Sequence, residues 1–226
     1  MRKLVVGAFV TADGVMQAPG GPDEDRDGRF EYGGWSVNYW DDFMGQVMDE
    51  QLHRAEAMLL GRKTYEIFAA HWPRVGGDDP FAAKLNGMPK YVASRTLGEV
   101  AWNNSHLLKG DVAEAVAQLK AQAGGEIHVN GSSNLIQTLL RHDLVDELML
   151  WVFPVLVGGG KLLFGEGVRP GALKLADTKT SSTGVVIQTY ECAGDLQCGS
   201  FAVDEEHVSQ ELWDKERPRS ESSLKA

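Results

Sequence analysis

Apolar and polar residues alternate along this chain in blocks that predict strands followed by helices. The first block, residues 3–10, is mostly apolar, as expected for a central strand with both faces covered. Further short apolar blocks predict strands at 57–60, 90–93, 106–109 and 126–129. Apolar residues at helical spacing predict helices at 38–55, 61–72, 111–123 and around 135–140.

The last third of the chain has a different pattern. A long apolar stretch, 145–157, predicts a strand interrupted at Pro154, and 173–192 predicts two strands that turn near Ser182-Thr183-Gly184. Strands alternate with helices four times before this hairpin, which is typical of an α/β sandwich with a mainly parallel sheet. Right-handed crossovers between parallel strands then place helices on both faces of the sheet.

Two segments lie outside this strand and helix pattern. The polar, Gly-rich stretch Thr11–Trp35 is long for a loop, and loops of that length are often functional. From Asp195 onward the chain has eight acidic and four basic residues and few large apolar ones. We therefore expect one folded domain over residues 1–194 and an acidic C-terminal extension over residues 195–226, docked or mobile.

Four polar motifs come directly after predicted strands. They are Thr11–Gly14, Gly61–Thr64, Ser94–Thr96 and Gly131–Asn134. In an open sheet of parallel strands, ligands bind beyond the carboxyl ends of the strands. We therefore expect these four motifs to converge on one ligand site.

The motif Gly61-Arg62-Lys63-Thr64 lies where a strand ends and a helix begins. The first turn of a helix has unpaired N–H groups and a partial positive charge. Two cations and a hydroxyl added at that point favour phosphate binding. The alternative is a glycine turn with a solvated pair of cations and a Thr cap.

Two further motifs allow a similar pair of interpretations. Ser94-Arg95-Thr96 has the groups to hold a phosphate on an adenosine ribose, since Arg grips phosphate with two hydrogen bonds, but a polar strand end has the same composition. Gly131-Ser132-Ser133-Asn134 either brings backbone N–H groups to a pyrophosphate or simply caps the next helix with Ser.

Other patterns argue against several chemistries. Gly158-Gly159-Gly160-Lys161 lacks a Ser or Thr after the Lys and no helical pattern follows, so it is not a P-loop. The six histidines show no ligand spacing with one another or with the cysteines, so we predict no metal site. No serine lies in a nucleophile elbow. By default, Asp13 is a turn former and Asp41 and Asp42 begin a helix.

Composition and charge narrow the class of partner. The chain has 226 residues, 43% of them hydrophobic, and a formal net charge of −10, so we expect neither nucleic acid nor an anionic membrane as a partner. Its apolar runs are far shorter than the ~18 residues that span a bilayer. The two cysteines, Cys192 and Cys198, do not make a disulfide framework, which favours a cytoplasmic location.

Taken in order, these motifs resemble the dihydrofolate-reductase-like superfamily, and more closely its branch related to the reductase domain of bacterial riboflavin biosynthesis. The resemblance covers residues 1–192 and is carried by the segments Val10–Val15, Leu60–Glu66, Lys90–Leu97, Val129–Ser132, Leu144–Leu148 and Pro154–Gly158. It implies a three-layer sandwich around a mixed, mainly parallel sheet of about eight strands. An antiparallel hairpin would close the sheet.

The resemblance also implies a cofactor, NADPH, bound across the strand ends. The segments after the strands would contact its phosphates, its adenosine and its pyrophosphate in turn, and the Thr11–Trp35 loop would close over it as a lid. The residues implied to bind NADPH are Ala8, Gly14, Gly61, Arg62, Lys63, Thr64, Ser94, Arg95, Thr96, Gly131, Ser132, Ser133 and Asn134.

Three carboxylates are candidates for the catalytic proton. Folate reductases have an acidic residue in the helix after the lid loop, and Asp41 or Asp42 could take that place, while Asp13 lies in the lid itself. Water is the alternative proton source. The sequence departs from the family pattern at Asn130-Gly131, where a Gly-Gly pair is common.

The sequence therefore predicts an NADPH-dependent reductase that transfers a hydride to a C=N or C=O bond. The substrate would be a small cytosolic metabolite of pterin- or ribosylaminopyrimidine-like class. The alternatives are a true dihydrofolate reductase, which needs a carboxylate aimed at the pterin, and a non-catalytic nucleotide-binding or dimerising module. The apolar stretch 148–157 suggests a homodimer, although the central strand of a monomer has the same pattern.

Overall fold

The computed structural model of the chain describes residues 1–76, 78–165 and 168–201. Residues 1–195 form one compact unit and residues 196–226 belong to a second. The helices and strands described below all lie in the first unit. The predicted acidic extension lies outside the described residues from position 202 onward.

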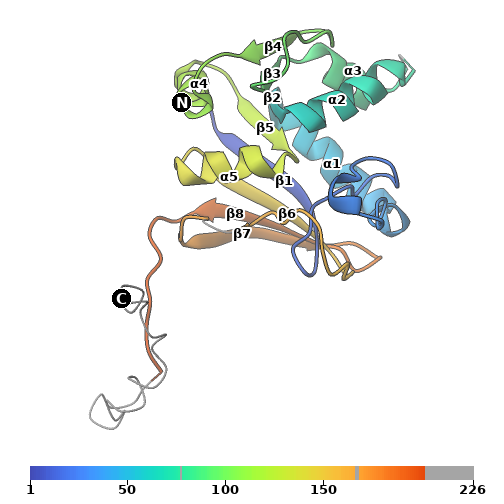
Figure 1. Ribbon diagram of the computed structural model, residues 1–226. Helices are drawn as coiled ribbons and strands as arrows, with labels where there is room; N and C mark the ends of the chain where they lie inside the picture. Colours follow the sequence, from blue (N-terminus) through green and yellow to red (C-terminus); the bar gives the residue numbers. More distant parts are fainter. Residues whose placement is uncertain (77, 166–167, 202–226) are drawn as a thin grey trace, which may run out of the picture. The chain divides into compact units, whose positions relative to one another are not determined.

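The first unit is built on one eight-stranded sheet with the order β4-β3-β2-β5-β1-β6-β8-β7 (Figure 1). The strands are β1 (Leu4–Thr11), β2 (Ala55–Gly61), β3 (Lys90–Ala93), β4 (Ser105–Leu108), β5 (Glu126–Asn130), β6 (Glu147–Phe153), β7 (Leu173–Thr180) and β8 (Val186–Cys192).

Strand direction confirms the predicted mixed sheet. The six strands β1 to β6 all run parallel to one another, whereas β8 is antiparallel to β6 and β7 is antiparallel to β8. β1 lies in the middle, with Gly7 opposite Asn130 of β5 on one side and Met149 of β6 on the other. The carboxyl ends of the parallel strands therefore meet at one edge.

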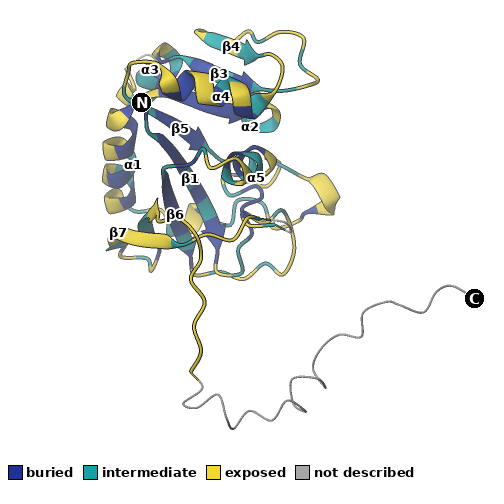
Figure 2. Ribbon diagram, turned by 90° about the vertical axis from the view of Figure 1, so that its left-hand side faces the viewer, coloured by how far each residue is buried: buried dark blue, intermediate teal, exposed yellow. Residues whose placement is uncertain are grey.

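Helices cover both faces of the sheet, as the alternating pattern predicted. They are α1 (Asp42–Arg54), α2 (Arg62–His71), α3 (Pro80–Gly87), α4 (Val112–Ala121) and α5 (Ser133–Arg141). Leu4, Val6 and Ala8 of β1 pack with side chains of α4 and α5, while α1 packs over Met149, Trp151 and Phe153 of β6. Figure 2 shows the central strands buried and β7, at the end of the sheet, exposed.

Helix α3 was missed by the sequence analysis, which predicted no helix or strand between residues 72 and 90. With eight residues it is too short to show helical periodicity. Its start nevertheless has a helix signature: Asp79 accepts a hydrogen bond from the Ala82 N–H and Pro80 occupies the first turn. α3 adds Leu85 to the core beneath β2 and β3.

Two other predicted elements are shorter than their apolar patterns. The helix predicted from 38 begins at Asp42, because Asp41 caps it and residues 37–39 form a separate short turn of 3-10 helix. The strand predicted over 145–157 spans Glu147–Phe153 and ends at Pro154. β6 lies between β1 and β8, so burial within one sheet accounts for its apolar residues.

The 12–41 loop, which contains most of the Thr11–Trp35 segment predicted as a lid, is folded against the strand-end edge. Val15, Ala18 and Phe30 form a small apolar cluster within it. The indole N–H of Trp35 donates to the Gln17 carbonyl at 2.8 Å and ties the two arms of the loop together. Across the described ranges, no helix is long and apolar enough to cross a membrane.

Candidate functional site at the carboxyl ends of the strands

The strand-end motifs lie at one edge of the sheet, as predicted. Thr11, Gly61, Ala93 and Asn130 are the last residues of the parallel strands β1, β2, β3 and β5. β2 and β5 are neighbours, so the segments 61–64 and 131–134 come into direct contact. Segment 94–96 follows β3, one strand further out.

Helices α2 and α5 begin side by side at this edge. Ser132 Oγ, just before α5, accepts a hydrogen bond from the Gly61 N–H at 2.9 Å and lies 2.7 Å from Thr64 Oγ1 in α2. A Cβ on residue 61 would lie 2.9 Å from Ser132 Oγ, so this approach requires glycine. The unpaired N–H groups and partial positive charges of two helices therefore converge.

Gly131 and Ser132 make a tight turn from β5 into α5. Both have left-handed backbone conformations, with φ of 66° and 73°, which glycine adopts freely and serine does not. The Ser132 side chain makes no capping hydrogen bond with its own helix. It bonds to the start of α2 instead, so the simpler alternative of a Ser-capped helix is wrong.

Both cations of the Gly61–Thr64 motif have partners. Arg62 is paired with Glu66 at 3.1 Å, one helical turn away. Lys63 Nζ donates to Asp25 Oδ1 at 2.9 Å and to Asp27, both in the 12–41 loop. Burial lowers the pKa of Lys63, but its hydrogen bonds to Asp27 and Asp25 outweigh burial and raise that pKa above the ordinary value.

The Ser94–Thr96 motif makes a compact turn. Ser94 Oγ accepts hydrogen bonds from the backbone N–H groups of Thr96 and Leu97 at 3.1 and 3.0 Å. Arg95 is exposed, and within the described ranges no acidic side chain pairs with it. Arg95 is therefore available to an anion, while the Ser94 hydroxyl stabilises the turn.

The three candidate carboxylates do not gather at one point. Asp13 accepts N–H bonds from Val157 and Gly158, and the Thr11 hydroxyl followed by the Gly158 N–H lowers its pKa. Asp41 accepts from Ser182 in the β7–β8 turn and from the N–H of Met44, and these contacts, in that order, lower its pKa. Asp42 is exposed on the first turn of α1.

Two other predicted cofactor residues, Ala8 and Gly14, contribute to the core and to a turn. The Ala8 side chain is 3% exposed and faces α4 and α5, so only its backbone faces the neighbouring strands. Gly14 has φ of 83° and its N–H donates to the Thr11 carbonyl, which makes the sharp turn after β1.

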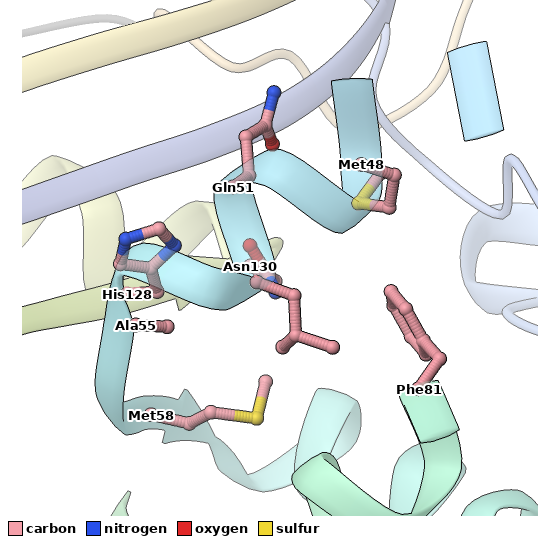
Figure 3. A pocket seen from close by; sticks show the side chains of 8 residues that line it. Met48, Gln51, Ala55, Met58, Phe81, His128 and Asn130 are labelled. Carbon is pink, nitrogen blue, oxygen red and sulfur yellow. The ribbon is translucent and has the colours of Figure 1, made fainter. Parts of the chain in front are cut away.

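A cluster of buried and half-buried polar side chains on the α1 face was missed by the sequence analysis. Gln51 of α1 and His128 and Asn130 of β5 surround a cavity of about 20 Å³, enough for one water molecule (Figure 3). Gln51 Nε2 is buried and has no hydrogen-bond partner in the described part of the chain. Met48, Leu52, Ala55, Met58 and Phe81 complete the lining.

His128 and Asn130 are the signal that could have revealed this cluster. They alternate along β5 with Ile127 and Val129, which face the opposite core, so polar residues occupy inward positions of a buried strand. His128 Nε2 lies 2.8 Å from Glu126 Oε2. Burial lowers the pKa of His128 and outweighs the opposing effect of Glu126.

Residues 2–187 match the family described as the RibD C-terminal domain. Two Bacillus subtilis proteins are similar over nearly their whole length, and both are named as uncharacterized. YyaP is 30% identical over 198 residues, which cover 85% of this chain and 96% of YyaP. YwjB is 26% identical over 180 residues, covering 79% and 91%.

Solved structures show the same fold at low sequence identity. A putative riboflavin biosynthesis protein from Shewanella sp. PV-4 has a TM-score of 0.61 at 23% identity, covering 84% of this chain and 99% of that one. A pyrimidine reductase-like protein from Corynebacterium diphtheriae has 0.57 at 14%, covering 86% and 93%. Dihydrofolate reductase from Enterococcus faecalis, complexed with NADP(H), has 0.53 at 13%, covering 84% and 96%.

Proposed function

Because this chain belongs to the RibD C-terminal domain family and has the dihydrofolate-reductase-like fold, we propose that it is an NADPH-dependent reductase. Family and fold support a reductase-type activity. The substrate we propose is a small metabolite with a C=N or C=O bond, of pterin- or ribosylaminopyrimidine-like class.

The observation that carries this proposal is the pair of helix starts joined through Ser132. Gly61 and Gly131 leave the turns open: a Cβ on residue 131 would lie 3.4 Å from Thr64 Oγ1, and one on residue 61 would meet Ser132. Backbone N–H groups and two hydroxyls at the paired helix starts, with Lys63 in the first turn of α2, would suit the oxygens of a pyrophosphate. Arg95, one strand further out, would favour a phosphate on the adenosine ribose.

The protein's contribution to such a reaction would be positioning. NADPH, when bound, would supply a hydride to the carbon of the C=N or C=O bond, and the nitrogen or oxygen of the same bond would take a proton. The segments at the strand ends would hold the phosphates, and the 12–41 loop would exclude water from the reacting atoms.

Water is the proton source we favour over Asp13 and Asp41. The pKa of each of these carboxyls is lowered by hydrogen bonds that stabilise the ionised form, so neither holds a proton at neutral pH. The ionised carboxylates instead tie the lid to the 157–158 backbone and α1 to the β7–β8 turn. Within the described residues, Asp41 contacts Ser182 and the Met44 N–H, and these contacts give no support to the dihydrofolate reductase alternative.

Titration with NADPH and, separately, NADH tests the cofactor assignment. Tryptophan quenching should report NADPH binding, and Arg62→Ala should weaken it about fivefold through loss of one exposed cation. Arg95→Ala should reduce the preference for NADPH over NADH. Arg141→Ala, at the far end of α5, removes the same charge and should leave binding unchanged.

The outcomes separate the three candidate functions. No binding of either cofactor by the wild-type chain would overturn the reductase proposal. Tight NADPH binding without turnover of any C=N or C=O substrate would favour the non-catalytic module. Dihydrofolate turnover that Asp41→Asn and Asp42→Asn abolish would favour the true dihydrofolate reductase.

A further inference from the structure

Four charged side chains from three segments form a closed cluster beside the start of α2. Lys161, from the loop after β6, donates to Asp25 Oδ2 at 2.5 Å and to Asp27 Oδ2 at 2.8 Å. Lys63 of α2 donates to the same two carboxylates. Both carboxylates belong to the 12–41 loop, so two lysines share one pair of acidic side chains.

The loop backbone holds these carboxylates in place. The Gln17 side chain, which is buried, donates to the carbonyls of Asp25 and Asp27 at 3.0 and 2.9 Å and accepts from the Lys161 N–H at 3.0 Å. Gly28 and Arg29 follow with left-handed φ values of 67° and 63°. The turn is thus shaped so that two oxyanions face two ammonium groups.

The ion pairs are close and open to solvent. Hydrogen bonds from Lys161 and then Lys63 lower the pKa of Asp27 to about 2. The side chains of Asp27, Lys63 and Lys161 are nevertheless 55%, 39% and 35% exposed. Next to them lies an open hollow of about 610 Å³ between segments 27–32 and 157–161, which Asp27 and Lys161 both line. An anion in solution can therefore reach the two lysines.

We propose that Lys63 and Lys161 form one binding site for a phosphate group, and that Asp25 and Asp27 occupy this site until a phosphate displaces them. Two carboxylates and a phosphate present similar oxygens to an ammonium pair, so they compete for it. The inference rests on the proposed function in placing a phosphorylated ligand at the start of α2. It adds Lys161 to the site and makes the loop an internal competitor of the ligand.

The chemistry fits either a dinucleotide or a phosphorylated substrate. Inorganic pyrophosphate represents the first source and inorganic phosphate the second, and neither contains a nicotinamide. Calorimetric titration with each, at constant ionic strength, therefore tests the two-lysine site separately from the reductase function. The probe whose affinity increases more when Asp25 and Asp27 are replaced indicates which kind of ligand the site takes.

The test variant is the double substitution Asp25→Asn and Asp27→Asn. Removing the competitor should tighten binding of one or both probes at least tenfold, and adding Lys161→Gln should reverse most of that gain. The control is Asp23→Asn with Asp49→Asn, which also removes two negative charges; Asp23 pairs with Arg26, Asp49 is exposed on α1, and neither lines the hollow. The control should change affinity less than threefold.

Three results would overturn the proposal. One is equal or weaker probe binding by the Asp25→Asn/Asp27→Asn variant; another is an equal gain in the control, which would mean that net charge alone is responsible; the last is a gain that survives Lys161→Gln. Circular dichroism checks that the variants fold. If the double variant does not fold, Asp27→Asn alone, which keeps Asp25 between the lysines, replaces it. If the wild-type chain does not bind NADPH but the Asp25→Asn/Asp27→Asn variant still binds pyrophosphate more tightly, the reductase function is refuted and the two-lysine site is not.

Discussion

The two edges of the sheet both carry clusters of charge, but they are built differently. At the amino edge, Glu147 is the first residue of β6, is 3% exposed and pairs with Lys3 and Arg54. Lys120, in the last turn of α4, is also 3% exposed and donates to the Leu144 carbonyl and Asp146. At the carboxyl edge, three of the four clustered charges are at least one-third exposed, and three lie on loops.

This difference separates charges that hold the fold from charges that can be exchanged. At the amino edge, each of these ion pairs includes one side chain that is at most 5% exposed, Glu147 or Lys120, so a ligand in solution cannot take its place. At the carboxyl edge, the carboxylates belong to a loop and can leave without unpairing a strand. Ligands of open α/β sheets bind at this second edge, and the contrast can be tested by substitutions on each side.

The largest effect should come from Lys120→Met at the amino edge. The substitution removes a buried ammonium and leaves the Leu144 carbonyl without its donor, which should lower the free energy of unfolding by about 3 kcal/mol. Affinity for NADPH and pyrophosphate should not change. Urea denaturation with a parallel binding titration measures both. A drop in affinity with little change in stability would contradict the assignment of the two edges.

An intermediate effect is expected for Ser132→Ala at the carboxyl edge. Loss of the Oγ bond to the Gly61 N–H should cost about 1 kcal/mol of stability, and the two helix starts should no longer be held together. NADPH affinity should therefore fall severalfold. Thr138→Ala, further along α5, removes a hydroxyl that bonds within its own helix and is the matched control. If both variants bind equally well, the contact between α2 and α5 does not shape the site.

The smallest effect should appear as a pH dependence of Asp27. Its folded pKa, about 2, lies below the ordinary value of 3.8, so its ion pairs stabilise the fold above that ordinary value. This contribution is lost as pH falls from 3.8 towards 2. The stability difference between wild type and Asp27→Asn, measured by urea denaturation across this range, should shrink accordingly. A difference that persists unchanged at the acid limit would argue against the ion pairs.

Most of the architecture could be predicted because it depends on local pattern. The apolar 3–10 block became central strand β1, and the four polar motifs after strands reached one edge because parallel strands force them to. Asp41 caps α1 and Asp111 caps α4, as helix-start rules require. Helix α3 escaped because eight residues show too little periodicity, although Asp79-Pro80 marked its start.

The candidate site was only partly predictable because its contacts join distant segments. Gly61 and Thr64 were identified from the strand end, but their bonds to Ser132 depend on β2 and β5 being neighbours. Lys161 was dismissed with its glycine run, since nothing in that run shows that it reaches Asp25, 136 positions earlier. Asp13 and Asp41 were proposed as proton donors because they are carboxylic acids. Only the structure shows the hydrogen-bond donors that lower the pKa of each and join each to a distant segment.

The reversed direction of β8 has a practical consequence for handling the protein. β1 begins at the amino edge, and β8, running against β6, finishes there too, with the Cys192 N–H bonded to the Asp146 carbonyl. An affinity tag before Leu4, or a dye or surface linkage at the exposed Cys192 thiol in a variant without the second exposed cysteine, Cys198, would thus be attached on the side of the sheet away from Lys63 and Lys161. The protein could be immobilised for ligand measurements with its strand-end edge facing the solution.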